Sequence, residues 1–154
     1  MKRVAEGLAA LLLVFWVGGM WAIGYIAAPS LFASLPDNHQ LAGNLAGLLF
    51  KWIAWVGIAA GCYLLVFRLG RDGFQALKQS FFWIVLVMLL LTLGQHFGIQ
   101  PIMQALKEQA LPHAVMESVF KNRFAAWHGV SSVIYLMESL LGAGLIWQRG
   151  FLAR

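Results

Sequence analysis

The chain has 154 residues, of which 61% are hydrophobic and only 11% are charged, and its mean hydropathy is +0.77. Soluble domains carry about 25% charged residues, so this composition excludes a soluble globular protein. The net charge of +5 comes from basic residues near the ends of apolar stretches, which indicates membrane orientation rather than nucleic-acid binding. The single cysteine, Cys62, excludes a disulfide within the chain.

Four apolar stretches take up most of the sequence. Each is long enough to cross a hydrocarbon core of about 30 Å, which takes about 20 helical residues. None has the period-two alternation of a barrel strand, so the sequence predicts an all-α fold, an antiparallel four-helix transmembrane bundle. We expect one integral membrane domain over residues 1–154, with transmembrane helices at about residues 7–30, 45–68, 80–100 and 124–148.

The first helix is expected to begin just after Glu6 and to run to about Leu35, with a kink near Pro29. A turn follows, in which Asp37 is the predicted N-cap of the second helix because Gln40 stands three residues later, in capping-box spacing.

The second helix carries small residues on one side of its helical wheel. The stripe contains two pairs in small-xxx-small register, Gly43 with Gly47 and Gly57 with Gly61. Small residues let transmembrane helices approach closely. The stripe predicts packing within the bundle, or alternatively a face for a homo-oligomer or for a membrane protein partner.

The third helix is expected to leave the membrane at Pro101. Apolar residues at helical spacing then form an amphipathic segment, broken at Pro112, that we expect to lie on the outer membrane surface or to cap the bundle.

The fourth helix carries a polar stripe, which should face the bundle interior. Its members lie within about half the circumference at 100° per residue: His128, Ser131, Ser132, Tyr135, Glu138, Ser139 and Gly142. Glu138 lies at a depth where a carboxylate costs a few kcal/mol. One interpretation is a proton-carrying or cation-binding group, relayed through Tyr135 and Ser131 towards His128. The other is a protonated carboxyl that hydrogen-bonds Tyr63, Trp16 or a backbone carbonyl and joins two helices.

Lys51, His96 and His128 are expected at a similar depth, within the first two turns of the membrane from the outer side. Two imidazoles on neighbouring helices are candidate ligands for copper or haem, so His96 and His128 are the candidate metal ligands. The alternative is that both histidines are hydrogen-bonded interface residues and that Lys51 is a lysine snorkelling to the interface.

The basic residues predict the topology. Seven would lie inside if the N-terminus is cytoplasmic: Lys2, Arg3, Arg68, Arg71, Lys78, Arg149 and Arg154. Four would lie outside: Lys51, Lys107, Lys121 and Arg123. This asymmetry favours an inner-membrane protein with both termini in the cytoplasm.

Several short motifs carry a family resemblance. They are Trp16-Val17-Gly18-Gly19, Gly24, Pro29-Ser30-Leu31-Phe32, residues 42–50, Gln100-Pro101 and Phe124-x-x-x-His128-Gly129-x-Ser131. In these the chain resembles the bacterial members of the transmembrane protein 205-like family, four-helix proteins carried as a domain of unknown function. The resemblance implies no defined activity. The animal relative is associated with cisplatin resistance, which hints at metal or drug handling.

More distantly, the chain is similar to CopD-like copper-resistance proteins and to the membrane protoporphyrinogen oxidase. Their first helix carries a histidine, whereas the first helix here has none.

No nucleotide-binding loop, nucleophile elbow or carboxylate pair is present in the sequence, which argues against an enzyme. The sequence therefore favours a small-ligand-binding, ion-binding or accessory module of the membrane. The alternatives are a haem- or copper-binding redox protein and a structural subunit of a larger membrane complex.

Overall fold

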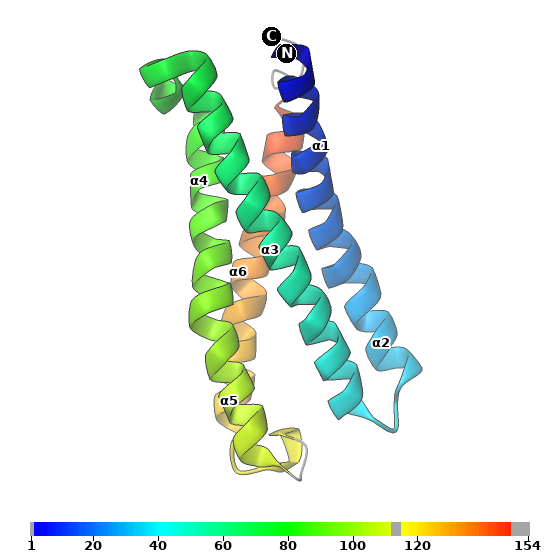
Figure 1. Cartoon of the computed structure of the whole chain (residues 1–154). Helices are drawn as coiled ribbons and strands as arrows, with labels where there is room; N and C mark the ends of the chain where they lie inside the picture. The colour runs from blue at the N-terminus through cyan, green and yellow to red at the C-terminus, as the bar shows by residue number, and fades with distance from the viewer. Residues whose placement is uncertain (1, 112–114, 149–154) are drawn as a thin grey trace.

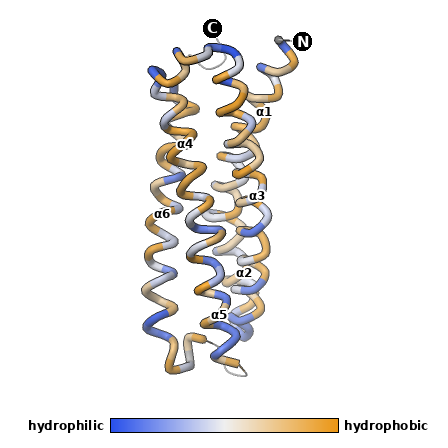
Figure 2. The backbone as a smooth tube through the Cα atoms, turned by 60° about the vertical axis from the view of Figure 1, so that its left-hand side comes forward, coloured by the Kyte–Doolittle hydropathy of each residue, from blue (hydrophilic) through white to orange (hydrophobic). Residues whose placement is uncertain are grey.

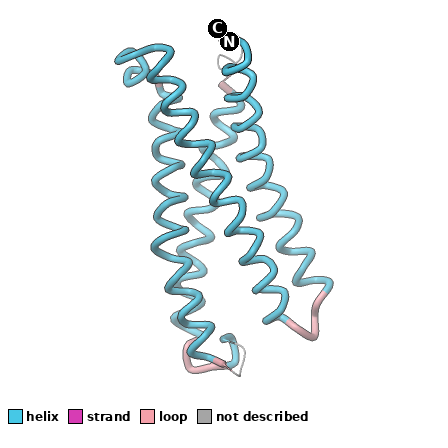
Figure 3. Tube along the Cα trace, in the orientation of Figure 1, coloured by secondary structure: helices cyan, strands magenta, loops and turns pink. Residues whose placement is uncertain are grey.

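The structure is a computed structural model that describes residues 2–111 and 115–148. The described part is helical with short connections (Figure 3). The elements in chain order are α1 (Lys2–Trp21), η1 (Ala22–Ala27), α2 (Ala28–Ser34), α3 (His39–Asp72), η2 (Gly73–Lys78), α4 (Ser80–Leu93), η3 (Gly94–Ile99), α5 (Gln100–Ala110), η4 (Val115–Glu117) and α6 (Lys121–Trp147).

These elements form four long helical rods. The rods lie side by side and alternate in direction, and α1 and α4 each pack against both α3 and α6 (Figure 1). The start of α1, η2 and the end of α6 lie at one end of the bundle, here called the η2 end. The opposite end, called the α5 end, holds α2, the start of α3, α5 and the start of α6.

The core is apolar and lies between α1, α3, α4 and α6. Its largest fully buried side chain is Trp16, which is 1% exposed. The rest of the cluster consists of Ala9, Leu13, Val17, Met20, Ile53, Ala60, Leu64, Phe81, Val85, Met88 and Leu145.

The outer surface is also apolar, which a soluble bundle would avoid. Leu11 and Phe15 on α1 and Leu140 on α6, for example, are each about two-thirds exposed. Within the described residues, four helical stretches are long and apolar enough to cross a membrane: Arg3–Ser34, His39–Lys78, Ser80–Ala110 and Lys121–Trp147. Together with the helix arrangement, this surface confirms the predicted four-helix transmembrane bundle, whose exposed side chains contact lipid.

Two π-helical turns interrupt the rods, each ending two residues before a proline. The first is η1 before Pro29, and the second is η3 before Pro101. Proline has no N–H, and its ring clashes with the carbonyl group four residues earlier, so a wider turn upstream lets the helix continue. The predicted kink at Pro29 thus takes the form of a π-helical turn, and the rod runs on to Ser34.

The second π-helical turn joins α4 to α5 without ending the rod. The predicted outer segment therefore continues the third rod and packs against α6, burying Met103, Leu106 and Ala110 (Figure 1). Pro112, at which that segment was expected to break, lies outside the described residues.

The N-cap of α3 is Asn38, whose side chain accepts a hydrogen bond from the Leu41 N–H at 2.9 Å. The predicted Asp37 cap was therefore wrong by one residue. Asn38 is the last residue with non-helical backbone before the helix, so its side chain reaches the free N–H groups of the first turn.

Candidate functional site

Glu138, in the middle of α6, is buried between helices and is only 3% exposed. Its Oε1 lies 2.7 Å from the Thr92 hydroxyl group of α4, and that hydroxyl also lies 2.9 Å from the Met88 carbonyl oxygen. A threonine hydroxyl has one proton to donate. If Thr92 donates it to Met88, the carboxyl group must be protonated and donate to Thr92. If Thr92 donates to Glu138, the Met88 carbonyl keeps only its helical hydrogen bond.

Gln95 on η3 extends this contact towards the α5 end. Its side chain lies beside the Glu138 carboxyl group, and its Oε1 accepts a hydrogen bond from the Ser131 hydroxyl group. Glu138, Thr92, Gln95 and Ser131 are called the Glu138 network below. The network ties the third rod to the fourth, since two of its members come from each.

The partners predicted for Glu138 were wrong. Tyr63 donates to the Ala5 carbonyl at 3.3 Å, and Trp16 packs against Gly57. The predicted relay through Tyr135 also differs, because the Tyr135 hydroxyl group donates to the Met20 carbonyl of α1. The residue that links Glu138 to Ser131 is Gln95, which the sequence analysis did not single out.

A second polar site is a pocket of about 530 Å³ at the α5 end, called the α5-end pocket below. It lies between α3 and the rod of η3 and α5. Its lining consists of Asn44, Gly47, Leu48, Lys51, His96, Gln100, Pro101, Met103, Gln104 and Lys107. Two of the three residues predicted to meet at this depth, Lys51 and His96, therefore line one pocket, and Lys107 joins them.

The described lining residues of the α5-end pocket carry basic and neutral polar groups and no carboxylate. Lys51 is exposed, and Lys107 is half-buried with its Nζ 3.3 Å from the Gly43 carbonyl oxygen. Among the described residues, no acidic side chain pairs with either lysine. The described lining of the pocket therefore has a positive charge that no carboxylate of the same lining balances.

The imidazole of His96 is fixed by aromatic neighbours rather than by hydrogen bonds. Its ring lies edge-on to Trp55, with centroids 5.1 Å apart, and edge-on to Phe97 at 4.8 Å. Its Nδ1 is buried and has no hydrogen-bond partner among the described residues. Such an atom loses its water without replacement, which costs about 1–3 kcal/mol, so a ligand or water that bonds to it would be stabilising.

His128, the third residue of the predicted cluster, is exposed and does not line the α5-end pocket. Its ring stacks on Phe124, with centroids 6.0 Å apart, and Ser132 donates a hydrogen bond to its carbonyl oxygen. Within the described residues, no group of three His, Cys, Asp or Glu side chains is placed to hold a metal ion. A metal site at His96 and His128 stays a prediction.

The four predicted packing glycines of α3 have different surroundings. A Cβ atom on Gly57 would lie 2.4 Å from the Trp16 Nε1, and one on Gly61 would lie 3.2 Å from Leu89. Near Gly43 it would meet Phe32 at 3.7 Å, whereas at Gly47 it would meet nothing within 4 Å. Gly57 and Gly61 are therefore occupied by contacts within the bundle, and Gly47 opens onto the α5-end pocket.

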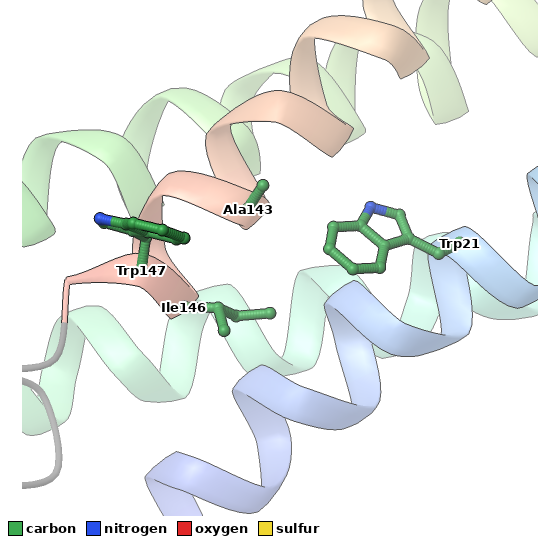
Figure 4. Close-up of a pocket in the computed structure, with 4 residues that line it drawn as sticks. All are labelled: Trp21, Ala143, Ile146 and Trp147. Atoms are coloured by element: carbon green, nitrogen blue, oxygen red, sulfur yellow. The ribbon is translucent and has the colours of Figure 1, made fainter.

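A smaller hollow of about 290 Å³ lies on the surface between α1 and α6. Trp21 faces it from α1, and Ala143, Ile146 and Trp147 line it from α6 (Figure 4). No described lining residue is charged, so this hollow suits an acyl chain of the surrounding lipid rather than a polar ligand.

The fold and these sites define a multi-pass membrane protein with a buried carboxyl group and a basic pocket at one end. The model of a protein family described as a domain of unknown function (DUF4149) matches residues 11–112. The chain belongs to this family. The match covers the pocket residues and the Glu138 partners on the third rod, and it ends before α6. No curated protein and no solved structure gives a significant match.

Proposed function

We propose that this protein is a small-ligand-binding module of the membrane and that the α5-end pocket is its binding site. The observation that carries the proposal is the lining of the pocket, to which two rods contribute Lys51, His96 and Lys107, and no described lining residue is a carboxylate. Volumes of about 300–1,000 Å³ are usual for small-molecule sites, and this pocket lies within that range.

The hydrogen-bonding groups of the lining support a binding site. Lys51, His96 and the amides of Asn44, Gln100 and Gln104 offer hydrogen-bond donors from two rods.

We further propose that the protein lies in the inner membrane with both termini in the cytoplasm, so that the α5-end pocket opens on the outer side. The seven-to-four distribution of basic residues supports this orientation. The motifs around Trp16, residues 42–50 and His128 support a relation to the transmembrane protein 205-like family, and more distantly to CopD-like proteins.

The binding proposal is tested by native mass spectrometry of the protein released from detergent micelles. Gly47→Leu places a side chain in the pocket from a position where a Cβ atom meets nothing. Gly18→Leu is the matched control, because Gly18 also lies in a helix with open space around it and does not line the pocket.

The wild type and Gly18→Leu should retain a bound mass that Gly47→Leu loses. The proposal would be contradicted if none of the three proteins carried a bound mass, or if all three carried the same bound mass.

A further inference from the structure

We infer that the ligand of the α5-end pocket carries a phosphate group, presented either on a phospholipid headgroup or on a free phosphate ester. This inference deepens the proposed function and rests on it. It depends on the charge of the lining, on the position of the pocket in the bundle and on the contacts that Lys107 makes.

The charge of the pocket selects an anion. Lys51 and Lys107 line it from α3 and α5, the two sides of the pocket. Glu108 accepts a hydrogen bond from Gln104 at 3.0 Å, but it is not among the lining residues. Two ammonium groups facing one space repel a cation and favour an anion, and a phosphate oxygen also accepts hydrogen bonds from amides and imidazole.

An anion would bind the ammonium group of Lys107 more strongly than its present partners do. Its Nζ lies 3.3 Å from the Gly43 carbonyl oxygen and 5.9 Å from the centroid of the Phe124 ring, over the face of that ring. Both are uncharged partners. A hydrogen bond from an ammonium group to an anionic oxygen is about twice as strong as one between neutral groups, so Lys107 gains by turning to a phosphate.

The position of the pocket suits a group at the membrane surface. It lies at the α5 end, where Figure 2 shows hydrophilic residues on α5 below the apolar middle of the bundle. The headgroup region of a bilayer lies outside its apolar core. A phosphate at that level can therefore reach the pocket while acyl chains lie along the exposed apolar helices.

The test measures binding to the full-length protein in micelles of an uncharged detergent, using tryptophan fluorescence, since Trp55 contacts the His96 ring. Three probes separate the possible sources: short-chain phosphatidylglycerol, diacylglycerol with the same chains, and glycerol phosphate. Phosphatidylglycerol should bind, and diacylglycerol should not. Binding of glycerol phosphate with similar affinity assigns the site to a free ester, and failure of glycerol phosphate alone assigns it to the lipid headgroup.

The lysines are tested by Lys51→Gln and Lys107→Gln, with Lys121→Gln as control. Lys121 is exposed on α6 at the same end of the bundle and does not line the pocket. Each pocket substitution should weaken phosphatidylglycerol binding about tenfold or more, whereas the control should change it less than about twofold. Should either variant misfold, the wild type still provides a test, because added salt must weaken binding to an anion.

Equal binding of diacylglycerol and phosphatidylglycerol would overturn the phosphate inference and leave the proposed binding function intact. Salt-independent binding would also overturn it. If the wild type carries no bound mass in the native spectrum and binds none of the three probes, the proposed function fails as well.

Discussion

Gly57→Ala should destabilise the bundle, although alanine is normally the better helix former. The added Cβ would lie 2.4 Å from the Trp16 Nε1 and 2.9 Å from its Cε2, so the indole would have to move by about 1 Å to reach ordinary contact. Trp16 is 1% exposed and surrounded by the core, which leaves it little room. Overpacking of this severity costs about 2–3 kcal/mol. Removing a helical glycine returns about 0.5–1 kcal/mol, so the net loss should be about 1–2.5 kcal/mol.

Gly47→Ala is the matched control on the same helix. A Cβ there meets nothing within 4 Å, so only the helix-propensity gain of about 0.5–1 kcal/mol should remain. Reversible unfolding in mixed detergent micelles, followed by circular dichroism, measures both changes. Since both variants share the gain from replacing glycine, their stabilities should differ by the overpacking cost of about 2–3 kcal/mol, with opposite signs relative to wild type. A Gly57→Ala protein at least as stable as Gly47→Ala would refute the packing of Trp16 against α3.

Three other predictions concern the remaining sites. Glu138→Gln keeps a donor and an acceptor and should change the free energy of unfolding by less than about 0.5 kcal/mol. Glu138→Leu removes the interhelical hydrogen bond to the buried Thr92 hydroxyl group and should cost about 1–2 kcal/mol. An equally stable Glu138→Leu protein in the same unfolding assay would show that the network does not join the helices. Alkaline phosphatase fused after Gln75 should be inactive and fused after Ala110 active, and the reverse activities would overturn the proposed orientation. If haem or copper binds, a Soret band or stoichiometric copper should be lost in both His96→Ala and His128→Ala, and a colourless, metal-free protein from cells supplied with both would eliminate the redox alternative.

The four helices could be predicted because the length of an apolar stretch alone decides whether it can span a membrane. The residue at which the second helix begins and the form of the irregularity near Pro29 were harder to predict. Asp37 and Asn38 are both good N-cap residues, and only the backbone decides which of two neighbours lies at the helix start. Pro29 predicted an irregularity in the first rod. Because either a kink or a π-helical turn can accommodate the N–H that proline lacks, the sequence did not distinguish the two.

The Glu138 network was harder to predict because its partners are isolated polar residues. Thr92 and Gln95 lie in a stretch without charge and form no periodic pattern, so nothing in the sequence marks them as facing Glu138. Their role follows from the packing of α4 against α6, which is a property of the whole bundle.

The depth of Lys51, His96 and His128 in the membrane was not enough to predict which of them line the same pocket. Counting residues from the membrane surface fixes the height of a side chain but not the direction in which it points around the helix. His96 and Lys51 point into the same pocket, whereas His128 lies on an exposed face beside Phe124. Lys107 was missed because the segment after Pro101 was expected to leave the third rod, and the π-helical turn keeps it in line.

The central claim is that the α5-end pocket holds a ligand through Lys51, His96 and Lys107. An experimental structure determined in bilayers containing phosphatidylglycerol tests it most directly. We expect density for a phosphate-bearing group in the pocket, beside His96 and within hydrogen-bond distance of at least one of the two lysine Nζ atoms. A pocket filled by protein side chains or by acyl chains alone would contradict the claim.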